Sequence, residues 1–142
     1  MNLALVLAPV FIQVALTFVL LIWSGVLRIN AVRAKTVHPR DIALGEPNWP
    51  PRPTQVANAY RNQLELPILF YLAILLAIIF GQATPAFVIL SWLFVGTRIV
   101  HAAIHTTSNR VGRRFYAYTA GLAIVILMWV VLILSLAFGG VE

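Results

Sequence analysis

The fold is decided by residues 58–80, NAYRNQLELPILFYLAILLAIIF, in which a polar half runs directly into an apolar half. No charged residue follows Glu65 in this stretch. At about 1.5 Å of rise per residue, a helix over these residues is long enough to cross the hydrocarbon core of a bilayer, which is about 30 Å thick. We therefore expect a membrane-spanning helix whose polar residues gather at one end.

The composition extends this pattern to the whole chain. Of its 142 residues, 61% are hydrophobic and only 10% are charged, and the mean hydropathy is +0.93. These values are far more apolar than those of an average soluble domain. Four spans of about 20 residues with short connections fill this length. We expect one all-α domain over residues 1–142, an integral membrane four-helix bundle with spans at residues 2–34, 54–81, 85–107 and 113–138.

The connections between these spans are marked by polar residues and prolines. A basic, proline-rich segment over residues 28–53 separates the first span from the second, for which Thr54 is a suitable N-cap. Residues 81–85 form a tight uncharged turn, and Pro67 predicts a kink inside the second span. The uncharged start of the chain, residues 2–27, is interpreted as a retained span because it lacks the basic segment of a signal peptide.

The basic residues predict the orientation in the membrane. All ten lysines and arginines lie in, or face, the connection between spans one and two and the connection between spans three and four. Because cytoplasmic loops of membrane proteins carry the excess of basic residues, both connections should be cytoplasmic. Both termini should then lie on the non-cytoplasmic side.

Charge and cysteine content exclude several functions. There is no cysteine, so the chain supplies no disulfide, no thiolate metal site and no thiol nucleophile. The net charge is +6, but the features of a nucleic-acid-binding domain are absent. We expect membrane lipid or a small anionic ligand as the partner, and no nucleic acid.

Two polar groups lie in helical register inside the second and third spans. Asn58, Arg61, Asn62 and Glu65 fall within an arc of about 100° on an ideal helix, and a second group on the third span falls within about 60°. The second group consists of Arg98, His101 and His105. Ionisable side chains at membrane depth are costly and normally face protein or water, so they indicate a functional site.

Counting residues from the turn at 81–85 brings these groups to similar depths. Glu65 lies roughly 24 Å and Arg98 roughly 18 Å along their helices. We expect an ion pair between them, inside a basic cavity near the cytoplasmic ends of the spans. A purely structural pair that fixes helix packing is the alternative interpretation.

Other basic and histidine residues also have two interpretations. Arg110, Arg113 and Arg114 precede the fourth span, where they could bind a ligand or set the topology beside phosphate head groups. His101 and His105 are spaced i, i+4, but no carboxylate pattern accompanies them, so we expect no metal site.

Three stretches together resemble a known family. They are residues 58–67 (NAYRNQLELP), residues 97–105 (TRIVHAAIH) and residues 113–119 (RRFYAYT). This ordered combination, in a four-span chain of this length, is similar to the MAPEG family, the membrane-associated proteins in eicosanoid and glutathione metabolism. The resemblance extends over nearly the whole chain.

The resemblance implies a homotrimer that binds glutathione between neighbouring subunits near the cytoplasmic face. Arg114 matches the arginine that stabilises the glutathione thiolate in the family, and is the expected catalytic residue. The residues that match glutathione-binding positions are Arg61, Asn62, Glu65, Arg98, His101, Arg110 and Tyr118. Arginines suit the two carboxylates of glutathione, and a glutamate suits its ammonium group.

The expected function is therefore that of a glutathione-dependent transferase or peroxidase acting on lipophilic electrophiles or hydroperoxides from the bilayer. The alternative is a noncatalytic lipid-binding protein or scaffold of the same fold. A transporter subunit fits less well, because the outer half of the bundle is almost wholly apolar.

The chain departs from the family pattern at two positions. His105 stands where better known members have a tyrosine, four residues after the third-span histidine. Phe115 removes a hydroxyl that is present in the prostaglandin synthase pattern, so we do not expect prostaglandin isomerisation.

Overall fold

The computed structural model describes residues 2–138, and over this range every regular element is a helix. Four stretches are long and apolar enough to cross a membrane, and the second consists of two α-helices joined by a short 3-10 helix. The protein is thus an integral multi-pass membrane protein. The helices are α1 (Leu3–Arg33), η1 (Pro39–Asp41), α2 (Pro51–Arg61), η2 (Asn62–Leu64), α3 (Leu66–Ile79), α4 (Pro85–Thr106) and α5 (Val111–Phe138).

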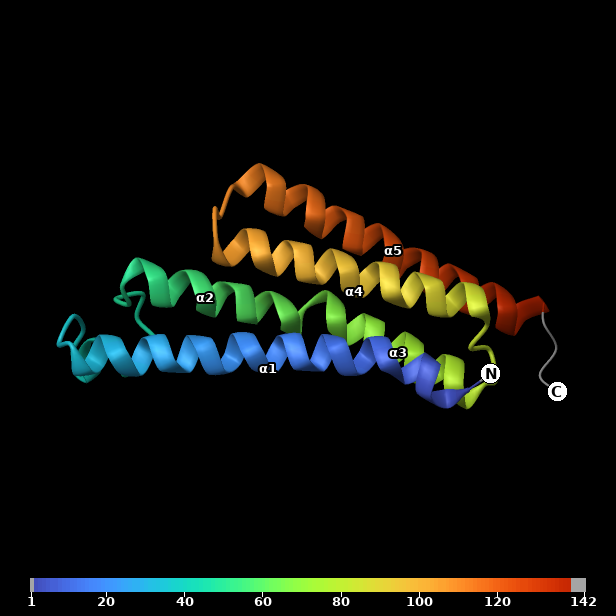
Figure 1. Cartoon of the computed structure of the whole chain (residues 1–142), viewed down its shortest axis with the longest axis horizontal. Coiled ribbons are helices and arrows are strands. Elements are labelled where there is room, and N and C mark those ends of the chain that lie inside the picture. Colours follow the sequence, from blue (N-terminus) through green and yellow to red (C-terminus); the bar gives the residue numbers. More distant parts are fainter. Residues whose placement is uncertain (1, 139–142) are drawn as a thin grey trace.

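The spans lie side by side as an antiparallel bundle (Figure 1). α1 runs along the span made of α2 and α3, while α4 pairs most extensively with α5. The start of α1 and the end of α5 lie at one end of the bundle, and the α1–α2 and α4–α5 connections lie at the other (Figure 1). We call these the terminal end and the connection end.

The core of the bundle toward the terminal end is apolar. Phe70 of α3 stacks on Phe94 of α4 with ring centroids 4.7 Å apart, and Met128 of α5 is fully buried in the same cluster. Large apolar side chains such as Phe18 and Ile133 are exposed on the outer faces of the helices. An outer surface of this kind is suited to hydrocarbon rather than to water.

Gly121 lets α4 and α5 approach closely. It is buried on α5, and a Cβ atom at this position would lie 2.8 Å from the Thr97 hydroxyl oxygen of α4. Small residues at such crossings allow membrane helices to pack backbone against side chain. Thr97 directly precedes Arg98, so this contact packs α4 against α5 beside the polar group of the third span.

The second span begins earlier than expected. α2 starts at Pro51, and Thr54 lies inside its first turn, where its hydroxyl donates to the Pro50 carbonyl at 2.9 Å. The prediction of Thr54 as the N-cap was therefore wrong. A proline at the first helical position has no N–H that needs a partner, and its fixed φ already fits the helix.

The second span is also broken near its middle. α2 ends at Arg61, η2 follows, and Glu65 with φ −100° and ψ −100° separates η2 from α3. Pro67, in the first turn of α3, has no N–H for a hydrogen bond back to residue 63. Where Pro67 predicted a kink, the structure has a break that divides the span into two α-helices.

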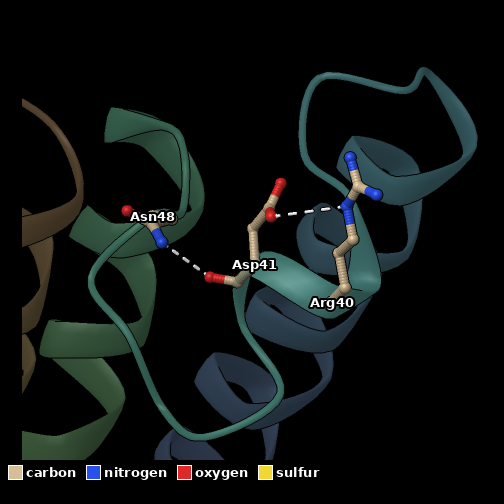
Figure 2. A network of polar contacts seen from close by, with 3 residues as sticks. All are labelled: Arg40, Asp41 and Asn48. Carbon is tan, nitrogen blue, oxygen red and sulfur yellow. Dashed lines mark hydrogen bonds and ion pairs between the residues drawn. The ribbon is translucent and has the colours of Figure 1, made fainter.

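The first connection is folded against the ends of α1 and α2. Arg40 and Asp41 form an ion pair at 3.7 Å, and the Asn48 amide donates to the Asp41 carbonyl at 2.6 Å (Figure 2). Nearby, the Arg28 guanidinium of α1 lies 4.9 Å from the centroid of the Trp49 ring. These contacts close the connection end beside α2.

Candidate functional site

Arg98 is the most deeply buried charged side chain in the described part of the chain. It is 0% exposed, and its Nη2 donates to the Asn62 carbonyl at 3.0 Å. In a regular α-helix, the Asn62 carbonyl would accept a hydrogen bond from the N–H of Leu66. The break at Glu65 lies between these two residues. Nε and Nη1 of Arg98 are buried and have no hydrogen-bond partner among residues 2–138.

The expected ion pair between Glu65 and Arg98 is not formed. Within residues 2–138 the ion pair between Arg40 and Asp41 stands alone, and the Glu65 side chain is exposed. The prediction assumed one continuous second helix. Because the helix breaks at Glu65, Arg98 reaches a backbone carbonyl instead of the carboxylate.

Two buried histidines follow Arg98 at successive turns of α4. His101 is 3% exposed and His105 is 2% exposed, and their ring centroids lie 5.6 Å apart. The Tyr118 ring of α5 lies 5.9 Å from the His101 ring and 5.7 Å from the Arg98 guanidinium. His101 Nδ1 is buried and unpartnered among the described residues.

A hydrogen-bonded chain crosses the site from the second span to α5. The Asn62 amide nitrogen lies 3.3 Å from His105 Nδ1, and Arg114 Nη1 lies 3.0 Å from His105 Nε2. The same Arg114 nitrogen donates to Asn109 Oδ1 at 2.6 Å. Residues from η2, α4, the last connection and α5 are thereby joined.

Two cavities share Asn62 and Arg114 in their linings. The first has a volume of about 270 Å³, and the second has a volume of about 200 Å³. The first is lined by Asn58, Arg61, Asn62, Glu65, His105 and Arg114. The second is lined by Asn62, His101, Val111, Arg114, Phe115 and Tyr118. Since Asn62 and Arg114 line both, we treat the two cavities as one site with two lobes.

The structure brings together most of the residues predicted for the site. Six of them line the two lobes, and Arg98 contacts two of these six, Asn62 and Tyr118. The six are Arg61, Asn62, Glu65, His101, Arg114 and Tyr118. Arg110 is exposed and lines neither lobe; its backbone carbonyl accepts the Arg114 N–H at 3.0 Å.

Sequence reasoning missed two features of the site. His105 was placed in the polar group of the third span but was not among the residues predicted to bind glutathione, although it contacts both Asn62 and Arg114. Its spacing of i+4 from His101 already placed it on the same face. Gln13, a polar residue in the uncharged part of the first span, is 0% exposed and donates to Gln63 Oε1 at 3.0 Å.

The charges of the site indicate the kind of ligand that it can accept. Arg61 and Arg114 line the lobes together with the single carboxylate of Glu65, and Arg98 lies behind them. Guanidinium groups bind carboxylates in bidentate fashion, and a carboxylate accepts an ammonium group. Among residues 2–138, no three His, Asp or Glu side chains gather closely enough to hold a metal ion.

These features define a four-span helical membrane protein with a basic, polar site toward the connection end of its bundle. The model of the MAPEG family matches residues 6–134, and the chain belongs to that family. The resemblance inferred from the three sequence stretches is thus confirmed. Membership supports a glutathione-related or eicosanoid-metabolism membrane protein. Neither a curated protein nor a solved structure matched the chain.

Proposed function

We propose that the protein is a glutathione-dependent membrane transferase or peroxidase acting on lipophilic electrophiles or hydroperoxides. The observation that carries the proposal is the basic lining of the two lobes by Arg61 and Arg114, together with buried nitrogens of Arg98 and of the lining residue His101 that have no partner among residues 2–138. Buried polar atoms normally have hydrogen-bond partners, and a buried charge without them is costly. A polar, anionic ligand would supply the missing partners.

Glutathione fits the charges of the site. Its two carboxylates would bind to the guanidinium groups of Arg61 and Arg98, and its ammonium group would bind to Glu65. Asn62, His101 and Tyr118 would contribute further hydrogen bonds around the peptide. Arg110, which is exposed outside both lobes, would contribute only long-range positive charge.

Arg114 would stabilise the thiolate. A thiol is a weak nucleophile at neutral pH, and a neighbouring permanent cation increases its ionised fraction. The thiolate would attack an electrophilic carbon to form a C–S bond, and the leaving group would depart with its electron pair. With a hydroperoxide, attack on the outer oxygen would break the O–O bond and give an alcohol and a sulfenic acid. A second glutathione would convert the sulfenic acid to disulfide and water.

A homotrimer would complete the site. Glu65 and Arg61 are exposed on a single chain. The 14 residues of α3, which separate Glu65 from the turn before α4, span only about 21 Å. Glu65 therefore lies within the depth of a bilayer about 30 Å thick, where an ionised side chain facing lipid is costly. Cover by a neighbouring copy removes this cost. By the distribution of basic residues, the site would face the cytoplasm and both termini the opposite side.

The test uses the purified full chain in detergent and in lipid vesicles. Glutathione binding is measured by calorimetry, and turnover is measured with a model electrophile and with an organic hydroperoxide. Arg114→Ala is expected to lower turnover by at least about a hundredfold while the trimer, checked by sedimentation, stays intact. Arg113→Ala, an exposed neighbour on the same helix that lines neither lobe, is the matched control.

Two outcomes contradict the proposal. Absence of glutathione binding to the wild-type trimer removes the basis for any glutathione-dependent activity. Glutathione-independent lipid binding without turnover favours the noncatalytic lipid-binding protein or scaffold instead.

A further inference from the structure

His105 connects three parts of the site. Its ring, on α4, is 2% exposed. Nδ1 faces the Asn62 amide of η2 at 3.3 Å, and Nε2 faces Arg114 Nη1 of α5 at 3.0 Å. Both ring nitrogens are therefore engaged by side chains that line the lobes.

The partner of Nε2 fixes the protonation state of the ring. A guanidinium group has hydrogen-bond donors and no acceptor. Nε2 must therefore accept the hydrogen bond from Arg114, which requires a neutral imidazole with its proton on Nδ1. The Asn62 amide nitrogen also donates to the Asn58 carbonyl at 3.1 Å, so the contact with Arg114, and not the longer contact with Asn62, decides the tautomer.

The contact also determines which donors of Arg114 are free. Nη1 carries two hydrogens, and both are used, one on His105 Nε2 and one on Asn109 Oδ1 at 2.6 Å. Nη2 and Nε have no partner among residues 2–138 and remain available beside the two lobes. Two acceptors thus hold one end of the guanidinium, and the other end can face a ligand.

We propose that neutral His105 is a positioning residue that holds the Arg114 guanidinium toward the thiol of the bound ligand. The inference rests on the proposed glutathione function and adds to it the group that orients the thiolate-stabilising cation. An arginine side chain has several rotatable bonds, and fixing it before the ligand binds removes an entropic cost from the reaction. His105 acts through Arg114 and needs no contact with sulfur.

The experiment compares the wild-type trimer with His105→Gln and His105→Phe. Glutamine offers an amide oxygen as acceptor, whereas phenylalanine offers none. In His105→Phe, we expect glutathione affinity to change by less than about threefold. The thiolate absorbance of bound glutathione and kcat should each fall about tenfold to a hundredfold, because a small displacement of a catalytic group has an effect of this size. His105→Gln should restore most of both signals. A merely structural role would not separate thiolate absorbance from affinity in this way.

Two further variants make the test specific. His38→Gln and His38→Phe alter an exposed histidine of the first connection and should match wild type. Asn109→Gly removes the second acceptor of Arg114 Nη1 and keeps the positive φ of 49° at that position. It should lower thiolate absorbance about threefold, in the manner of losing one modest hydrogen bond. It carries the test if His105→Phe fails to form a trimer.

The outcomes separate this inference from the proposed function. If wild type does not bind glutathione, both are overturned. If wild type binds glutathione and His105→Phe keeps full thiolate absorbance and kcat, only the positioning role of His105 is overturned. Equal losses in His105→Gln and His105→Phe overturn it as well, as does an unchanged Asn109→Gly when His105→Phe cannot be purified.

Discussion

The terminal half and the connection half of the bundle are built on different principles, although the same spans run through both. In the terminal half, apolar side chains such as Phe70 and Met128 pack together. The buried Ser91 in this half donates to the Phe87 carbonyl of its own helix at 2.8 Å. In the connection half, Arg98, His101 and His105 occupy the equivalent buried positions of α4.

The difference lies in how completely the buried atoms are satisfied. Apolar packing in the terminal half needs no specific partners and is complete within one chain. In the connection half, Arg98 and His101 retain buried nitrogens without partners. A region arranged only for stability would pair these atoms or replace them with apolar groups. Under the proposed function, stability comes mainly from the terminal half and ligand binding from the connection half.

Phe70→Ala should break the terminal half and leave the connection half working. Phe70 is 0% exposed and stacked on Phe94, and truncating such a side chain leaves a cavity that costs about 3 to 5 kcal/mol. Thermal unfolding in detergent should occur at a clearly lower temperature. Glutathione affinity of the folded fraction should stay within about twofold, because neither Phe70 nor Phe94 lines the two lobes. A large loss of affinity without a loss of stability would contradict the division of roles.

Arg98→Met should do the reverse. Methionine fills a similar volume without burying a charge, and such replacements are often neutral or stabilising. We expect glutathione affinity to fall about a hundredfold or more, as when one partner of a buried charged contact is removed. The unfolding temperature should stay equal to wild type or rise. Marked destabilisation with intact glutathione binding would support the structural interpretation of Arg98.

Gly121→Ala and Gly96→Ala form a smaller, matched test of the boundary between the halves. A Cβ atom at Gly121 would lie 2.8 Å from Thr97 Oγ1, whereas a Cβ atom at Gly96 meets nothing within 4 Å. Overpacking at Gly121 should cost about 1 to 3 kcal/mol, while Gly96→Ala should gain about 0.5 to 1 kcal/mol from helix propensity. Thermal unfolding measures both. Equal effects would show that the α4–α5 contact at Gly121 is looser than described.

Much of the fold could be predicted from the sequence. Four apolar stretches separated by polar and proline-rich segments indicate four membrane spans, because span length is set by bilayer thickness and helical rise. The polar faces of the second and third spans follow from helical periodicity, and Pro67 indicates the kink. The start of α2 was misplaced, because Thr54 and Pro51 are both suitable helix-start residues and only the folded chain distinguishes them.

The partners of the buried polar groups were not predictable in the same way. Depth counting placed Glu65 and Arg98 at similar levels, but it could not specify how far the break at Glu65 displaces the carboxylate from the guanidinium. The central position of His105 likewise depends on how closely α5 brings Arg114 to α4.

Residue order alone was enough to predict the membrane class, the four spans, the family resemblance and the residues that form the polar faces. Hydrophobicity and helical periodicity are properties of one segment at a time, so they can be recognised without knowledge of tertiary contacts. The contact of Arg98 with the Asn62 carbonyl and the contact of His105 with Arg114 became known only from the folded chain. Hydrogen bonds depend on distances of a few tenths of an ångström between different helices, and these distances are set by packing and by the break at Glu65.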